Sequence, residues 1–188
     1  MTTTDPRPLT GEPIALDLLN TRWTRDGVPV DLFAGAGAAG LTRVEGVALW
    51  LRSTGLDDRF QADAPTLIHL LTAREALARA VADPADEGAR ALVDAVLENG
   101  RIRVTLTARG PGERAEFADP AWGPAWTAAR GYLDLLATAP GRIRSCAGED
   151  CTLRFFDASR GGTRRWCARG ACGNRAQAPH HPARTRVR

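Results

Sequence analysis

The chain contains no lysine, so all 25 of its basic residues are arginines. Together with the high alanine and glycine content, this points to a compositional bias of the whole genome. The abundance of arginine therefore carries little functional information, and only the places where arginine clusters do.

The sequence also lacks any targeting or membrane signal. Residues 1–6 have neither a basic start nor an apolar segment of the kind found in secretory signals. No run approaches the roughly 18 apolar residues that a membrane-spanning helix needs. We therefore expect a cytoplasmic protein that does not engage a membrane.

Catalytic patterns are absent as well. The motifs G-x-S-x-G and H-E-x-x-H do not occur, and His69 is the only histidine outside the C-terminal tail. The glycine run 35–40 lacks both the Lys-Ser/Thr of a phosphate-binding loop and the spacing of a dinucleotide fingerprint. We predict that the protein is not an enzyme.

What the chain does have is two identical cysteine pairs in its last quarter. They follow the pattern C-x4-C and are separated by 15 residues, namely Cys146, Cys151, Cys167 and Cys172. Two such pairs can each bend the backbone and direct two sulfurs at one tetrahedral Zn²⁺. Four protein ligands leave no open position, so the predicted zinc is structural and stabilises a segment too small to bury its own core.

Other interpretations of these cysteines stay open. Two disulfides or four free thiols are the alternatives, although disulfides belong mainly to oxidising compartments. His180 or His181 could also replace one sulfur, but the flanking Pro179 and Pro182 favour a flexible tail.

Charge is distributed unevenly along the chain. Residues 141–188 hold 11 arginines and three acids, a net charge of +8, whereas residues 1–140 hold 14 arginines and 19 acids, a net charge of −5. A small basic module beside a larger acidic domain is typical of nucleic-acid-binding proteins.

Apolar periodicity predicts a mostly α-helical N-terminal domain of the α+β class. Helices are expected over 44–54, over 65–82, from Pro84 with Asp83 as N-cap, and after Asp119-Pro120. The alternation over 101–107, followed by a turn and residues 114–117, predicts a β-hairpin. The segment 14–22 fits either a strand or a first helical turn. We expect disorder over 1–12, a domain over 13–140, a finger over 141–178 and a flexible basic tail over 179–188.

Within the finger, the composition of 152–157 predicts a strand that turns at 159–162 and returns over 163–166. A short helix is expected from Cys172, where its dipole would favour the anionic sulfurs. Pro179 must end or kink that helix.

The finger resembles the CGNR zinc-finger family. The matching residues are Cys146, Cys151, the run Phe156-Asp157-x-Ser159-Arg160, Arg164-Arg165-Trp166-Cys167 and Cys172-Gly173-Asn174-Arg175. The N-terminal part is similar to the ABATE domain that usually precedes this finger, through Leu18-Leu19-Asn20-Thr21-Arg22, Asp31-Leu32 and Trp50-Leu51. The resemblance implies a bacterial, stress-induced transcription regulator whose finger binds DNA and whose first domain senses a ligand or forms a dimer.

For nucleic-acid binding we single out seven residues. Phosphate contacts are expected from Arg154, Arg160, Arg164, Arg165 and Arg169, and base contacts from Asn174 and Arg175. Arg175 could instead bond a thiolate or a carbonyl, and Asn174 could cap the helix. Family members continue with a basic helix at this point, whereas the prolines at 179 and 182 interrupt it here.

Two other partner classes remain open for the finger. Phe155, Phe156 and Trp166 could stack on unpaired RNA bases, although they could also pack the hairpin over the zinc. The finger could also serve as an adaptor surface for a protein. For a small-molecule effector in the first domain, the candidate pocket residues are Asn20, Arg22, Trp23, Asp31 and Trp50.

Overall fold

In the computed structural model, which describes residues 4–35, 40–168 and 172, five α-helices are accompanied by three small antiparallel hairpins. The helices are α1 (Ile14–Leu19), α2 (Arg43–Ser53), α3 (Ala64–Ala82), α4 (Glu87–Leu97) and α5 (Gly123–Thr138). The strands are β1 (Arg22–Arg25), β2 (Val28–Asp31), β3 (Gly100–Thr107), β4 (Gly110–Phe117), β5 (Ile143–Ser145) and β6 (Arg154–Phe156). Short 3₁₀ turns cover Pro120–Trp122 and Pro140–Arg142. The predicted α+β class is confirmed.

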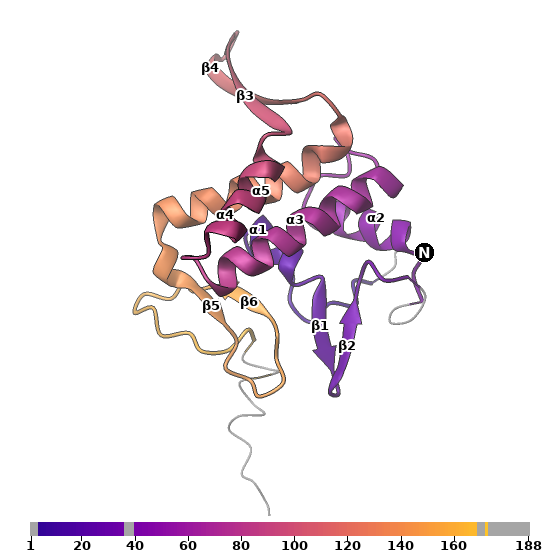
Figure 1. Ribbon diagram of the computed structural model, residues 1–188, viewed down its shortest axis with the longest axis vertical. Coiled ribbons are helices and arrows are strands. Elements are labelled where there is room, and N and C mark those ends of the chain that lie inside the picture. Colours follow the sequence, from indigo (N-terminus) through magenta and orange to yellow (C-terminus); the bar gives the residue numbers. More distant parts are fainter. Residues whose placement is uncertain (1–3, 36–39, 169–171, 173–188) are drawn as a thin grey trace, which may run out of the picture.

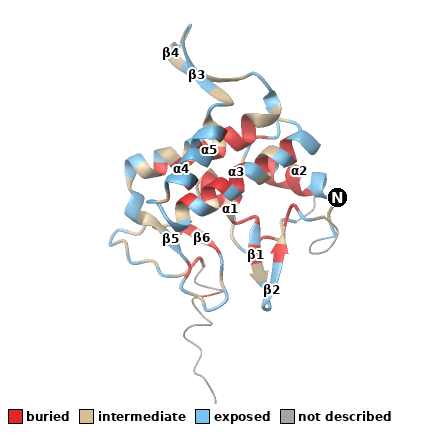
Figure 2. Ribbon diagram, viewed as in Figure 1, coloured by how far each residue is buried: buried red, intermediate tan, exposed pale blue. Residues whose placement is uncertain are grey.

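The helices form the core around α3, which Figure 1 shows at the centre of the molecule between α2 and α4. Its inward face is mostly apolar, through Leu67, Leu70, Leu77 and Ala80, and it also buries Thr66 and Arg74. The short α1 is almost completely buried, as the red ribbon in Figure 2 shows. The helical alternative for 14–22 is thus the one that forms, and only the last residue of this segment, Arg22, belongs to a strand.

Side-chain caps determine where the helices begin. Thr42 and Glu45 form a reciprocal capping box at α2, and the Asp63 carboxylate accepts the Thr66 N–H at α3. The predicted helix α4 is present but its predicted start was wrong, because Asp86 and not Asp83 is its N-cap and accepts from the Ala89 N–H. Asp83 instead ends α3, and its carboxylate accepts the Ala85 N–H in the connecting turn.

The three hairpins do not merge into one sheet. The β1–β2 hairpin turns at Asp26-Gly27, where both residues have positive φ, a conformation typical of a tight two-residue turn. The β3–β4 hairpin pairs Gly100 with Phe117 and Thr107 with Gly110, in the region predicted from the alternation. It projects away from the helices in Figure 1.

The start of the chain is packed against this core from Arg7 onward. The Arg7 side chain is buried, and its guanidinium bonds Asp5, the Asp17 carboxylate at 2.5 Å and the Ser53 hydroxyl at 2.7 Å. The expectation of disorder over 1–12 therefore does not hold at Arg7. The cause is an ion-pair network that sequence periodicity does not reveal.

Among the residues that the structure describes, no helix has the length and apolar character needed to cross a membrane.

Candidate metal centre and basic surface

Four sulfurs converge in the C-terminal module. The ligand atoms of Cys146, Cys151, Cys167 and Cys172 all lie within 4.8 Å of one another. The Sγ atom of Cys167 lies 3.8 Å from that of Cys151 and 3.6 Å from that of Cys172. Tetrahedral Zn–S bonds of about 2.3 Å place neighbouring sulfurs about 3.8 Å apart, so the cluster has the dimensions of a zinc site. The same distances are far beyond the roughly 2.05 Å of a disulfide bond.

The backbone around the first pair is shaped to hold a metal. Gly148 lies inside the Cys146–Cys151 loop, where an added Cβ would come within 3.2 Å of the Cys172 sulfur. The N–H groups of Gly148 and Cys167 donate to the Cys146 sulfur at 3.5 and 3.3 Å. Such N–H···S bonds stabilise a thiolate ligand and fix its direction.

The electrostatics of the cluster also favour metal binding. A hydrogen bond with Cys167 lowers the pKa of the Cys151 thiol to about 5. The same contact with Cys151 raises the pKa of Cys167. Zn²⁺ binds cysteines as thiolates, so metal binding displaces the protons that the four thiols still carry.

The hairpin of the finger differs from the expected one. Strand β6 lies within the predicted segment 152–157, but its partner is β5, with Ile143 opposite Phe156 and Ser145 opposite Arg154. The predicted return strand 163–166 was wrong, since its backbone groups bond elsewhere. The Arg164 N–H donates to the Asp157 carboxylate at 3.0 Å, and the Arg165 carbonyl accepts from the Ala147 N–H at 2.8 Å.

Asp157 and Arg142 organise the turn after β6. The fully buried Asp157 carboxylate accepts from the Ser159 hydroxyl at 2.6 Å and from the Ser159 N–H at 2.9 Å, and these bonds lower its pKa. Arg142 donates to the carbonyls of Asp157 and Ser159, both at 2.7 Å. We did not predict either role. The D-x-S pattern is an Asx-type turn signal that could have identified Asp157.

Arg164 is held inside the module. Its guanidinium stacks on the Phe155 ring at 4.1 Å, donates to the carbonyls of Phe156, Trp166 and Cys167, and pairs with Glu12 at 3.1 Å. With its donors occupied in this way, Arg164 is placed to support the finger rather than to meet a phosphate.

Three other arginines of the module face outward. Arg160 and Arg165 are exposed, as is Arg144 on β5, which we had not singled out. None of the three forms an ion pair within the described part of the chain, although Arg165 lies 5.2 Å from the Trp166 ring centre.

Arg154 is half-buried, because its backbone is engaged by the N-terminal domain. Arg169, Asn174 and Arg175, together with the helix expected after Cys172, lie outside the described residues.

Two side chains of the N-terminal domain form hydrogen bonds with the backbone of β6. The Asn20 amide exchanges two hydrogen bonds with the backbone of Arg154, each of 2.8 Å. The Glu12 carboxylate accepts the Phe156 N–H at 2.9 Å and pairs with Arg164. Phe155 lies between these contacts and is fully buried in the shared core.

The candidate pocket residues are only partly brought together. Arg22, Trp23 and Asp31 line a cavity of about 900 Å³ beside the β1–β2 hairpin, which Thr152 of the finger also lines. Asn20 is engaged by Arg154, and Trp50 is fully buried in the core, so neither is among the residues that line this cavity. The buried Arg74 pairs with Asp31 at 2.7 Å and anchors β2 to α3.

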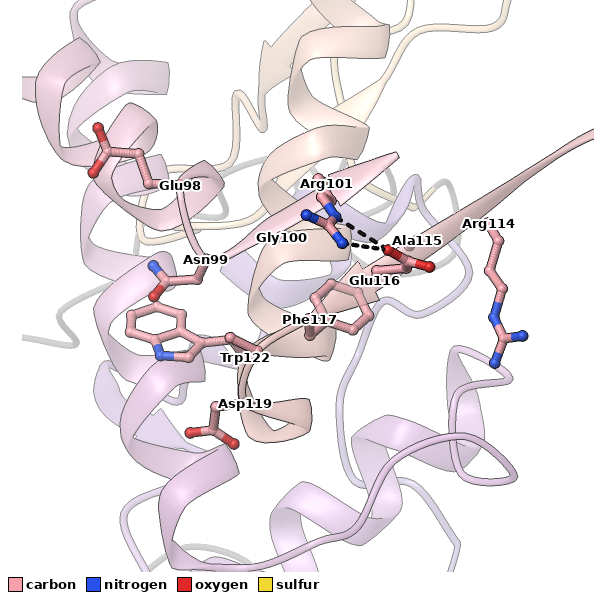
Figure 3. A pocket seen from close by; sticks show the side chains of 11 residues that line it. Glu98, Asn99, Gly100, Arg101, Arg114, Ala115, Glu116, Phe117, Asp119 and Trp122 are labelled. Carbon is pink, nitrogen blue, oxygen red and sulfur yellow. Dashed lines mark hydrogen bonds and ion pairs between the residues drawn. The ribbon is translucent and has the colours of Figure 1, made fainter. Parts of the chain in front are cut away.

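A second cavity, of about 830 Å³, opens at the base of the β3–β4 hairpin. Figure 3 shows Glu98, Asn99 and Asp119 around the Trp122 ring, and the Arg101–Glu116 pair at the base of the strands. Sequence reasoning did not identify it, since its residues come from separate segments with no common motif. It includes no candidate nucleophile or metal cluster among the residues that line it.

Comparison with known families agrees with this geometry. Residues 142–185 match the model of the CGNR zinc finger, and residues 12–139 match that of the ABATE domain, described as "Putative stress-induced transcription regulator". No curated protein matches the chain. The four cysteines thus hold one structural zinc ion, which supplies the crosslink that closes the module. The chain belongs to the ABATE family and carries a C-terminal CGNR zinc finger.

Proposed function

We propose that the protein is a DNA-binding transcription regulator in which the zinc-stabilised module contacts DNA. The observation that carries this proposal is the set of exposed arginines around the zinc site, Arg144, Arg160 and Arg165, which lack acidic partners within the described residues. Guanidinium groups that are not neutralised by the protein are available for phosphate oxygens. The net charge of +8 over 141–188 supports the same choice.

The contacts between the two domains offer a way for the first domain to regulate DNA binding by the finger. Asn20 and Glu12 both bond to the same strand, β6. A movement of the first domain would therefore also move the exposed arginines Arg144, Arg160 and Arg165. The cavity beside β1–β2 lies at this junction, because Thr152 belongs to the finger and Trp23 to the first domain. We propose this cavity as the effector site, with Arg25 among its lining residues for an anionic group and Trp23 for an apolar one.

The test is selection of the full-length, zinc-loaded protein against random duplex DNA, with single-stranded RNA in parallel. Enrichment of a duplex motif is expected. The double variant Arg160→Ala/Arg165→Ala should weaken binding about tenfold or more and reduce its salt dependence, because two phosphate contacts are lost.

A matched control keeps the same change in net charge. Arg52→Ala/Arg59→Ala removes two exposed arginines from the first domain and should leave DNA binding unchanged. Equal losses in the two double variants would show that binding follows overall charge, and the proposal would then be wrong. Enrichment in the RNA pool alone would favour RNA binding through Phe156 and Trp166. No enrichment in either pool would favour a protein-interaction adaptor.

A further inference from the structure

The β3–β4 hairpin carries an apolar face that nothing in the described chain covers. Ile102, Val104 and Leu106 are 40%, 75% and 84% exposed, and they account for three of the seven large exposed hydrophobic residues among those described. The strand register places Ala115, Glu113 and Pro111 on the same face, opposite Ile102, Val104 and Leu106 respectively. The core therefore ends at the base of the hairpin. The outer part of the hairpin is exposed to solvent on both faces.

On the opposite face of the hairpin, Glu116 pairs with two arginines. Glu116 accepts two hydrogen bonds from Arg101 and pairs with Arg103 at 3.3 Å, as the dashed lines in Figure 3 show for Arg101. These bonds lower the pKa of Glu116, first through Arg101 and then through Arg103. The apolar face of the hairpin and its two strand edges thus have no partner among the described residues.

The two edges are not equivalent. Strand β4 contains Pro111, which has no N–H, between Gly110 and Gly112, and proline and glycine both weaken an edge for further pairing. Strand β3 is rich in β-branched residues and has neither residue after Gly100. An isolated two-stranded hairpin is marginally stable in water, so the β3 edge is the one that gains from a further strand.

We propose that β3 pairs with β3 of a second copy of this chain, which creates a four-stranded sheet in the order β4-β3-β3-β4. The pairing is antiparallel about a two-fold axis at Val104. Val104 then lies opposite Val104 of the other copy, and Ile102 opposite Leu106. Because the interface has two-fold symmetry, each contact away from the axis, such as that of Ile102 with Leu106, occurs twice.

The side-chain pattern of β3 is self-complementary in this register. With the axis at Val104, Arg103 lies opposite Thr105 and Arg101 opposite Thr107, so no like charges face each other. An axis at Arg103 would place two arginines directly opposite, and an axis at Thr105 would place Arg101 opposite Arg109 of the turn. The Val104 register is the one that keeps the apolar residues together and places no two arginines directly opposite each other.

No helix or strand among the described residues lies beside the outer part of this hairpin in Figure 1. In Figure 1 the hairpin extends beyond the helices, on the side of the molecule away from β5 and β6. A pair of short strands buries less than the roughly 800 Å² per partner of a stable interface, so we expect a dimer in the micromolar range. Such a dimer would present two zinc modules at opposite ends.

The test is sedimentation velocity of the full-length, zinc-loaded protein from about 1 to about 200 μM, which brackets micromolar association. The wild type should shift from monomer to dimer across this range. Val104→Lys should remain monomeric, because two cations would meet on the axis. Val28→Lys, which also replaces a strand valine that is 61% exposed, should dimerise like the wild type.

Cysteine crosslinking tests the register itself. Under mild oxidation of zinc-loaded protein, Val104→Cys should form a crosslinked dimer, since the two residues are directly opposite. Leu106→Cys should not, because the two copies of that residue lie about four positions apart, roughly 13 Å. A wild type that stays monomeric, a Val104→Lys variant that still dimerises, or open-ended association in place of a dimer would each overturn the proposal. DNA binding by the finger does not enter any of these readouts.

Discussion

Asn20 of α1 and Arg154 of β6 exchange two hydrogen bonds, from the Asn20 amide to the Arg154 carbonyl and from the Arg154 N–H to the Asn20 side-chain oxygen, both at 2.8 Å. The side chain thereby acts as a substitute for a neighbouring strand at the edge of the β5–β6 hairpin. Asn20 is 1% exposed, so these bonds have no water to replace them. One buried amide therefore couples the helical domain to the zinc finger.

Replacing Asn20 should weaken this coupling. Asn20→Ala leaves the N–H and carbonyl of Arg154 without partners in a buried place, which costs roughly 1–3 kcal/mol of the free energy of unfolding. The measurement is urea denaturation of the zinc-loaded protein. The matched control is Asn99→Ala, since Asn99 is half-buried and its side chain donates only to carbonyls of α4, the helix that it follows. Equal effects of the two substitutions would contradict a special role for Asn20.

The zinc site predicts a stoichiometry and a structural consequence. Purified protein should contain one Zn²⁺ per chain, released on thiol modification and measured with a chromophoric chelator. Because the module has little core of its own, zinc removal should expose Phe155 and Leu153 and change the fluorescence of Trp166. Cys167→Ser should lose most of the zinc. Metal-free protein with a mass reduced by two disulfides would contradict the assignment.

Sequence reasoning was most successful where a local pattern sets the structure. The four cysteines, the alternation over 101–107 and the apolar face of α3 each depend on residues close together in the chain. The finger hairpin was wrong for the opposite reason. Strand β6 pairs with β5 because Asn20 and Glu12, more than 130 positions away, bond its other backbone groups. No local signal contains that information.

The arginines of the finger illustrate the same limit. Composition does not distinguish Arg164 from Arg165, which are adjacent and equally charged. The structure places one on the Phe155 ring and against Glu12, and leaves the other exposed. Arg164 has a structural role because it lies on the buried Phe155 ring. Tertiary packing, and not local sequence, determines which of the two arginines meets that ring.

Arg164 and Arg165 should accordingly differ when replaced. Arg164→Ala removes the donor to three carbonyls and an ion pair, and should lower the free energy of unfolding by roughly 1–3 kcal/mol. Arg165→Ala should leave stability within about 0.5 kcal/mol, as expected for an exposed side chain. Thermal denaturation of both variants, with zinc content measured in each, makes the comparison. A stable Arg164→Ala variant would mean that its contacts contribute little.

The pair formed by Asp31 and Arg74 predicts a dependence of stability on pH. Burial acts to raise the pKa of Asp31, but the hydrogen bonds and charge of Arg74 outweigh it and lower the pKa below its usual value. A carboxyl whose folded pKa is depressed stabilises the fold above its unfolded pKa of about 3.9, and this contribution is lost as pH falls through the folded pKa. The free energy difference between wild type and Asp31→Asn should therefore be largest near neutral pH and shrink below about pH 4.

Since both proteins carry the same cysteines, loss of zinc in acid affects them alike and leaves this difference to Asp31. Asp134→Asn, which breaks an exposed pair with Arg130, should show only a small difference throughout. A difference for Asp31→Asn that does not change between pH 7 and pH 3 would show that its role is packing and not charge.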